Sequence, residues 1–273
     1  MEIKLITDSR QLKQLFGYVS GLDQAIHITL DKDKVTAIAV SLGNDKIKKI
    51  EYVSKSIIKE TEALSSVPFV INFMQVERIK KIINQFNGEI EMTLNYTEAP
   101  DKKCHYVISV IFSDPVLKLS QKTVDWSYYT SMNIPSTETV EMLAEEKTCI
   151  SGNIPNEAIQ RLKVLAAINP TDLMSSLFLE CVEGYIRAFE YSDIEQYNKN
   201  KERMYQFILC EAIQKEKCCI EIDKEVLKHL SSLSDSILFE IHGDISSPSH
   251  CVFKSADAEG NVKSLFIISI KIN

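Results

Sequence analysis

The sequence predicts an α+β protein made of two similar halves, each with two helices and a set of antiparallel strands. Three observations lead to this prediction. Many short segments alternate apolar and polar residues with a period of two, which is typical of half-buried strands. Four longer segments carry apolar residues at helical spacing. The order of these elements recurs in the second half of the chain although the residues do not, which indicates a duplication.

The strands are expected from alternation and from the turn residues between them. The clearest covers residues 89–96, where Ile90, Met92, Leu94 and Tyr96 share one face. The other expected strands are residues 2–6, 24–30, 35–40, 69–73, 106–112, 177–182, 185–191, 237–242 and 263–272. Tight turns are expected at residues 31–34, 43–44, 87–88, 183–184 and 259–261, where Gly, Asn and Asp suit hairpins.

Four helices are expected over residues 9–20, 74–86, 155–168 and 224–233. Asp8 or Ser9 can accept hydrogen bonds from the first turn of the first helix, Pro155 suits the entry of the third, and Asp223 stands before the fourth. The apolar stripes are Leu12, Leu15, Phe16 and Val19; Val76, Ile79, Ile83 and Phe86; Ile159, Leu162, Leu165 and Ala166; and Val226, Leu227 and Leu230.

The polar faces of these helices are basic although the chain has a formal net charge of -7. They carry Arg10, Lys13, Arg78, Lys80, Lys81, Arg161, Lys163, Lys224, Lys228 and His229, against only Glu77, Glu157 and Glu225. One such helix is an ordinary solvated helix. Four helices with the same bias in an acidic chain indicate a localised positive surface.

Length and composition indicate a globular protein. The 273 residues suffice for two domains, and 45% hydrophobic with 25% charged residues is ordinary for such proteins. Because the sequence has neither a run of about 18 apolar residues nor the pattern of a signal peptide, we expect no membrane contact and a cytoplasmic location, at the site of genome replication in a cell or an infected host.

The seven cysteines are expected to be reduced, because their number is odd and most lie in apolar, strand-like runs. Cys218 and Cys219 are adjacent, so in a strand they would point to opposite faces and could not share a metal. His250 and Cys251 are also adjacent, so for the same reason they could not share a metal. We therefore expect no metal site and no cofactor.

No catalytic motif is present in the sequence. It lacks the glycine-rich phosphate loops and the GxSxG nucleophile motif, and its five histidines are scattered. Asp31 and Asp33 lack the glycine and later glutamate of a calcium loop and are better explained as a hairpin tip. The sequence therefore favours a protein that is not an enzyme and that works by shape and charge.

The predicted domains are residues 1–121 and 147–273, joined by a linker at 122–146. The linker holds the only Trp in an aromatic cluster of Trp126, Tyr128 and Tyr129, and it ends in acidic residues that could form a helical turn or two. Residues 192–203 are polar and are expected to form an exposed loop.

Three stretches resemble the ring-shaped DNA polymerase sliding clamps, in particular the two-domain kind that includes proliferating cell nuclear antigen and the clamps of tailed phages. The first is VINFMQVERIKKIINQFNGEIEMTLNY. The second is IEIDKEVLKHLSSLSDSILFEIHGD with the following HCVFKSADAEGNVKSLFIISIKI, and the third is NIPNEAIQRLKVLAAINPTDLMSSLFLECVEGYIRAFE. Together the similarity extends over nearly the whole chain.

The resemblance implies the DNA-clamp fold, assembled as a homotrimeric ring that encircles duplex DNA without reading its sequence. A separate clamp loader would open the ring, and the ring would tether a DNA polymerase to its template. The resemblance assigns to the DNA-facing lining Arg10, Lys13, Arg78, Lys80, Lys81, Arg161, Lys163, Lys224 and Lys228. It places partner binding near Trp126, Tyr128, Tyr129, Ile270 and Ile272, for which burial in the local core is the alternative.

Two other functions remain open from the sequence. The first is a monomeric viral processivity factor of the same fold that binds DNA by one basic face, which differs from the ring in its mass in solution. The second is an α+β enzyme or enzyme subunit, which would reveal itself by a cleft with strongly shifted titratable groups.

Overall fold

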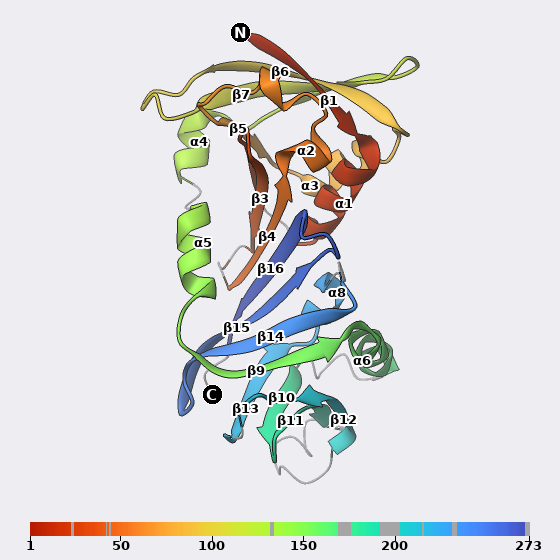
Figure 1. Cartoon of the computed structure of the whole chain (residues 1–273), viewed down its shortest axis with the longest axis vertical. Helices are drawn as coiled ribbons and strands as arrows, with labels where there is room; N and C mark the ends of the chain where they lie inside the picture. Colours follow the sequence, from red (N-terminus) through yellow and green to blue (C-terminus); the bar gives the residue numbers. More distant parts are fainter. Residues whose placement is uncertain are drawn as a thin grey trace. The chain divides into compact units, whose positions relative to one another are not determined.

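The computed structural model describes residues 1–22, 25–41, 43, 45–131, 134–168, 176–191, 203–214, 216–230 and 234–270. The chain forms two compact units, shown with their elements in Figure 1. Unit 1 contains Met1–Val140 with Glu259–Ser264, and unit 2 contains Glu141–Ala258 with Leu265–Asn273. Of the helices in the described ranges, none is long and apolar enough to cross a membrane.

Unit 1 is built from two sets of antiparallel strands. Its strands are β1 (Glu2–Asp8), β2 (Ile26–Leu30), β3 (Lys34–Val40), β4 (Lys46–Val53), β5 (Phe69–Phe73), β6 (Glu89–Glu98), β7 (His105–Ser113) and β8 (Lys118–Lys122). Its helices are α1 (Ser9–Val19), α2 (Ser54–Ile57), η1 (Thr61–Ala63), α3 (Val76–Ile83) and α4 (Trp126–Ser131), and α5 (Thr137–Ala144) begins in it. The strand orders are β4-β3-β2-β5 and β1-β6-β7-β8, and a short parallel contact joins β5 to β7.

Unit 2 has the same design. Its strands are β9 (Thr148–Pro155), β10 (Ser176–Val182), β11 (Tyr185–Tyr191), β12 (Arg203–Glu211), β13 (Cys218–Asp223), β14 (Ser236–Asp244), β15 (Ser247–Ala256) and the greater part of β16 (Val262–Ser269). Its helices are α6 (Asn156–Ile168) and α8 (Val226–His229). One sheet has the order β12-β11-β10-β13, and β9, β14, β15 and β16 are neighbours in the other.

The two units therefore repeat one connectivity. In each, a strand and a helix lead into three antiparallel strands, and a further strand and helix lead into a second set of three. The pairing of β1 with β6 corresponds to that of β9 with β14, and the pairing of β2 with β5 to that of β10 with β13. The predicted α+β class, with two similar halves of two helices on antiparallel sheets, is confirmed.

The helices begin where local chemistry allows. The Asp8 side chain accepts a hydrogen bond from the Arg10 N–H at 2.8 Å, so Asp8 is the N-cap of α1. The second helix starts at Val76 instead of residue 74, because Gln75 has a left-handed backbone with φ 59°. The fourth starts at Val226 instead of residue 224, since Asp223 accepts from the Glu225 N–H in a local turn. Residues 231–233 of that predicted helix lie outside the described ranges.

Two of the predicted turns, at residues 87–88 and 183–184, contain a glycine whose backbone has a positive φ. Gly88 between α3 and β6 has φ 74°, and Gly184 between β10 and β11 has φ 81°. These are conformations that glycine adopts without a steric penalty. Asn44 and residues 192–202 fall outside the described part of the chain, whereas Arg203 begins β12.

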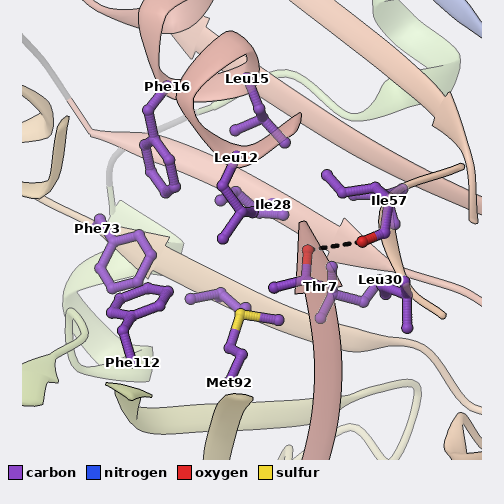
Figure 2. A pocket seen from close by; sticks show the side chains of 13 residues that line it. Thr7, Leu12, Leu15, Phe16, Ile28, Leu30, Ile57, Phe73, Met92 and Phe112 are labelled. Atoms are coloured by element: carbon purple, nitrogen blue, oxygen red, sulfur yellow. Dashed lines mark hydrogen bonds between the residues drawn. The ribbon is translucent and has the colours of Figure 1, made fainter. Parts of the chain in front are cut away.

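The apolar stripes of all four helices face the cores. Of the fifteen predicted stripe residues, only Leu165 is not fully buried. Beneath α1, Phe16 and Phe73 lie with their ring centroids 6.1 Å apart. Figure 2 shows the small apolar cavity of about 20 Å³ that remains among Leu12, Leu15, Met92, Phe112 and their neighbours. At its edge the Thr7 hydroxyl donates to the Ile57 carbonyl at 2.6 Å. The packing leaves the polar sides of the helices turned away from the apolar interior.

Candidate nucleic-acid interface

In unit 1 the helices α1 and α3 pack side by side. Two hydrogen bonds cross between the helices or the residues that follow them. Lys13 Nζ on α1 donates to Asn87 Oδ1 at 3.2 Å, and Lys80 Nζ on α3 donates to Ser20 Oγ at 3.0 Å. Since each bond joins one helix to the residues just after the other helix, α1 and α3 run antiparallel.

The predicted basic residues of unit 1 lie together on this helix pair. Arg10, Arg78 and Lys81 are exposed, whereas Lys13 and Lys80 are half-buried by the bonds just described. Arg10 also lies 3.6 Å from the Asp8 carboxylate, but its side chain remains 86% exposed, so the pair is open to solvent. The helix pair therefore presents a row of cations that a polyanion can reach.

A buried lysine that the sequence reasoning missed fixes the end of α1. Lys48 on β4 is 1% exposed, and its ammonium donates to the carbonyls of Tyr18 and Ser20, both at 2.9 Å. The pKa of Lys48 is lowered to about 7, mainly by burial and in smaller part by the charge of Lys80, while Glu77 acts in the opposite direction. The two ammonium groups thus meet at Ser20, Lys48 on its carbonyl and Lys80 on its hydroxyl.

In unit 2 the helices α6 and α8 pack together in the same way. Lys163 Nζ on α6 donates to the Leu230 carbonyl just after α8 at 2.7 Å, and burial lowers the pKa of this lysine. Arg161 is exposed, and its guanidinium lies 5.5 Å from the ring centroid of Phe207. Lys228 is 73% exposed and lies 3.0 Å from Glu225. Unit 2 therefore exposes fewer of the predicted cations than unit 1.

Lys224 occupies a different environment from the other predicted lining residues. Its side chain is 19% exposed, and its ammonium lies 3.6 Å from the fully buried carboxylate of Glu190 on β11. Glu190 also accepts a hydrogen bond from the Tyr205 hydroxyl at 2.7 Å. The structure thus ties Lys224 to the sheet below the entry of α8 and separates it from Lys228, four residues later.

The predicted partner-binding residues differ in their local surroundings. Trp126 packs on Tyr106 with ring centroids 5.1 Å apart, next to a small core cluster of unit 1. Tyr128 is 51% exposed. Ile270 is partly buried against the core of unit 2. The side chain of Tyr129 and the whole of Ile272 fall outside the described part of the structure.

Two of the pockets in the described part of the chain differ from an enzyme cleft. The cavity under α1 is lined by apolar residues and Thr7. An open pocket beside β6 carries Glu89, Glu91 and Asp114, and the pKa of Glu91 is lowered by its hydrogen bond to Lys4. Neither pocket places a nucleophile beside a histidine or lysine base. Among the described residues, no group of three or more His, Cys, Asp or Glu could hold a metal ion.

Comparison with known proteins gives matches in structure alone. No protein-family model matches the chain. No curated protein matches its sequence.

Three solved structures illustrate the structural similarity. A structure of the C-terminal region of FEN-1 bound to A. fulgidus PCNA matches with a TM-score of 0.69 at 14% identity, over 99% of both chains. The PCNA2–PCNA3 complex from Sulfolobus tokodaii matches at 0.65 and 10% identity, over 99% of both chains. The proliferating cellular nuclear antigen of Entamoeba histolytica matches at 0.66 and 9% identity, over 99% of this chain and 98% of that one. The chain therefore has the DNA-clamp fold.

Proposed function

We propose that this chain, with its DNA-clamp fold, is a sliding clamp: a processivity factor that encircles duplex DNA and tethers a DNA polymerase to its template. The observation that carries the proposal is the paired basic helices. In both units two helices pack side by side, bury their apolar stripes and turn lysine and arginine outward. The match over 99% of the PCNA chain in two of the compared structures supports the same function.

The charge distribution suits such a role. Duplex DNA is a dense line of phosphates, which lysine and arginine attract without reading bases. The proposed lining consists of Arg10, Lys13, Arg78, Lys80, Lys81, Arg161, Lys163 and Lys228. Lys224, which the resemblance placed with them, is left out of the proposed lining because its ammonium is held by the buried Glu190. The net charge of -7 places an excess of negative charge elsewhere on the molecule and would keep DNA from adhering there.

The proposed assembly is a homotrimer closed by head-to-tail contacts. The domains of each subunit would be residues 1–121 and 147–273, with 122–146 as the linker. Among the described strands, five pair with one neighbour only: β8 of unit 1 and β12 of unit 2 are two of them, and β1, β9 and β13 are the others. Pairing β8 of one subunit with β12 of the next would cover both edges, and three repeats of one such contact can close a ring.

The proposed partners follow from the clamp function. One of the compared structures is a PCNA with the C-terminal region of FEN-1 bound. By analogy, this chain would bind replication proteins, a polymerase and a clamp loader among them, near the linker. Tyr128 is the exposed aromatic residue there. The clamp itself would carry out no chemistry.

Retention on circular DNA tests the proposal. Protein loaded onto a nicked circle that is then sealed should stay bound in 0.5 M salt, because a closed ring is held by topology. Cutting the circle should release it within minutes, since the salt screens the phosphate contacts. Equal loss from closed and linear DNA would rule out encirclement.

The mass in solution, measured by light scattering, tests the ring. We expect three times 31.0 kDa for the homotrimer. A monomer at every accessible concentration that still binds linear DNA would instead identify the open-faced processivity factor.

A further inference from the structure

A glycine interrupts the exposed face of α1. That face carries Arg10, Lys13, Gln14 and Gly17, which follow one another at helical spacing and are exposed or half-buried. Glycine inside a helix lowers stability relative to alanine, because its flexible backbone loses more freedom on folding. The last exposed position of α1 therefore holds a residue that the helix itself disfavours.

Within the described part of the chain, nothing requires a glycine at this position. Gly17 does not have a positive φ, whereas Gly88 does. A Cβ built on Gly17 would have no described heavy atom within 4 Å, apart from the helix backbone around it. At Gly152, by contrast, a Cβ would lie 2.8 Å from the Cys210 sulfur. Gly17 thus leaves open space on the surface of the helix pair, where a side chain would fit.

Two cross-helix hydrogen bonds flank this space along α1. One turn before Gly17, Lys13 Nζ donates to Asn87 Oδ1 at 3.2 Å. Just after Gly17, the Ser20 hydroxyl accepts from Lys80 Nζ at 3.0 Å and donates to the Gly17 carbonyl at 2.9 Å. Gly17 therefore lies between two ammonium groups, and one of them is joined to its carbonyl through a single hydroxyl.

The end of α1 is prepared for an anion. The C-terminal end of a helix ordinarily repels negative charge, because its last carbonyls lack partners. Here four of these carbonyls are covered: Ser20 donates to those of Phe16 and Gly17, and Lys48 donates to those of Tyr18 and Ser20. The negative end of the helix dipole is thus satisfied from within the protein.

The charged groups near this space are mainly positive. Lys13 and Lys80 are the two ammonium groups at the surface, and Lys48 adds part of a charge from below, since its pKa is about 7. Glu77 lies 3.8 Å from Lys80 and offsets part of this charge. The surroundings of Gly17 therefore attract a small anionic group.

We propose that Gly17 forms the base of a phosphate site made of Lys13, Gly17, Ser20 and Lys80, an inference that rests on the proposed function. One backbone phosphate of the duplex would lie over Gly17 and accept hydrogen bonds from both lysines. The missing side chain lets the phosphate approach the helix backbone closely. A side chain there would keep the phosphate from Lys80, which is only 35% exposed. The site reads no base, since phosphate contacts carry no sequence information.

Unit 2 lacks this site. Val164 stands at the same distance from the start of α6 as Gly17 does from the start of α1. The Val164 side chain is 61% exposed, so it occupies the space that is open above Gly17. The two halves of the chain should therefore differ in how closely a phosphate approaches the first helix of each pair.

Thermal unfolding and DNA binding of Gly17→Gln test the site together. The variant should unfold about 1–3 °C higher than the wild type, because glutamine is the better helix former and has room. Its affinity for a short linear duplex at low salt should nevertheless fall about three- to tenfold, and the slope of log affinity against log salt should decrease by about one. A lower unfolding temperature would show that the fold itself needs the glycine and would overturn the proposal.

Two control variants separate the site from its surroundings. Val164→Gln places the same side chain at the equivalent exposed position of α6 and should bind the duplex like the wild type. Gln14→Ala removes a neutral side chain from the same face of α1 and leaves Gly17 open, so its affinity should also be unchanged. A loss in either control as large as that in Gly17→Gln overturns the assignment to Gly17.

A double-mutant cycle with Lys80→Ala identifies the contact that is lost. Lys80→Ala alone should weaken binding, and adding Gly17→Gln to it should cause little further loss, because both changes remove the same phosphate contact. Equal fractional losses in the two backgrounds overturn the phosphate site. If Lys80→Ala weakens binding whereas Gly17→Gln binds as tightly as the wild type, the site alone fails. If the wild type does not bind linear duplex at low salt, the proposed function fails together with the site.

Discussion

At the scale of single residues, Lys224 and Lys228 show how differently two lysines in one short stretch can act. Lys224 is bound to the buried Glu190, whereas Lys228 is 73% exposed. Lys224→Met should lower the free energy of unfolding by about 2–3 kcal/mol, because it removes the counter-charge of a buried carboxylate. Lys228→Met should change it by less than about 0.5 kcal/mol. Urea unfolding of the two variants makes the comparison.

DNA binding should show the reverse order for the same two variants. Lys228→Met should weaken binding to linear duplex and lower its salt dependence, since one phosphate contact is lost. Folded Lys224→Met should bind like the wild type. Equal DNA defects in both variants would place Lys224 on the DNA-facing surface and contradict its assignment to the sheet.

Lys48 gives the stability a defined pH dependence. Its pKa is about 7 in the folded chain, below the ordinary lysine value of 10.5. Between these values the unfolded state binds a proton that the folded state does not, so stability rises with pH by up to about 1.4 kcal/mol per unit. Below pH 7 the amine is protonated in both states and its contribution is constant.

The variant Lys48→Met should remove that rise. Thermal or urea unfolding between pH 6 and pH 9.5 measures it as a difference between wild type and variant. Lys55→Met, which changes an exposed lysine on α2, is the matched control and should give a curve parallel to the wild type. Parallel curves for Lys48→Met would mean that Lys48 stays charged throughout this range.

A sequence signal for Lys48 existed. Successive strand residues point to opposite faces, so one of Lys48 and Lys49 had to point toward the interior if residues 46–53 form a strand. In the structure both are buried, Lys48 at 1% and Lys49 at 7% exposure, and Lys49 lies 3.2 Å from the Glu51 carboxylate. The same rule separated Cys218 and Cys219 correctly, since the first is buried and the second exposed. What the sequence could not supply was the acceptor, because Tyr18 and Ser20 lie about thirty residues away.

At the scale of elements, α3 offers the sharpest test of the DNA-facing surface. Lys80→Ala with Lys81→Ala should leave the fold intact, since neither residue is buried in the apolar core. Affinity for linear duplex at low salt should fall about tenfold, and the slope of log affinity against log salt should decrease by about two.

The matched control for α3 removes the same charge elsewhere. Lys32→Ala with Lys103→Ala takes two exposed lysines from loops of unit 1, away from β8, the strand proposed to join subunits. These lysines are not part of the proposed lining, so filter binding to linear duplex should be unchanged. A similar loss in both double variants would show that net charge, and not the position of the helix, governs binding.

Helix positions could be predicted well and helix ends less well. The apolar stripes gave all four helices because burial imposes the helical period. The second and fourth helices start two residues late, because Gln75 and Asp223 adopt local turns that hydrophobic spacing does not reveal. In the linker, the acidic end predicted as a turn or two of helix is α5.

At the scale of the whole molecule, element order was enough to predict the fold class and the duplication. It could not predict pairing. Strand β1 joins β6 across more than eighty residues, and β8 and β12 were recognised as strands only in the structure. Long-range pairing depends on closing large loops, which leaves little trace in local sequence. For the same reason the ion pair between Lys224 and the buried Glu190 could not be predicted from the sequence.

The cross-helix bonds of Lys13, Lys80 and Lys163 affect how easily a bound polyanion could slide along the helices. Each ammonium already has an oxygen partner within the protein. A phosphate that recruits one of these lysines replaces one acceptor with another, so the net gain is small and the reverse exchange is easy. A polyanion passing these helices would meet shallow, closely spaced wells instead of a few deep ones, and shallow wells permit fast diffusion along it.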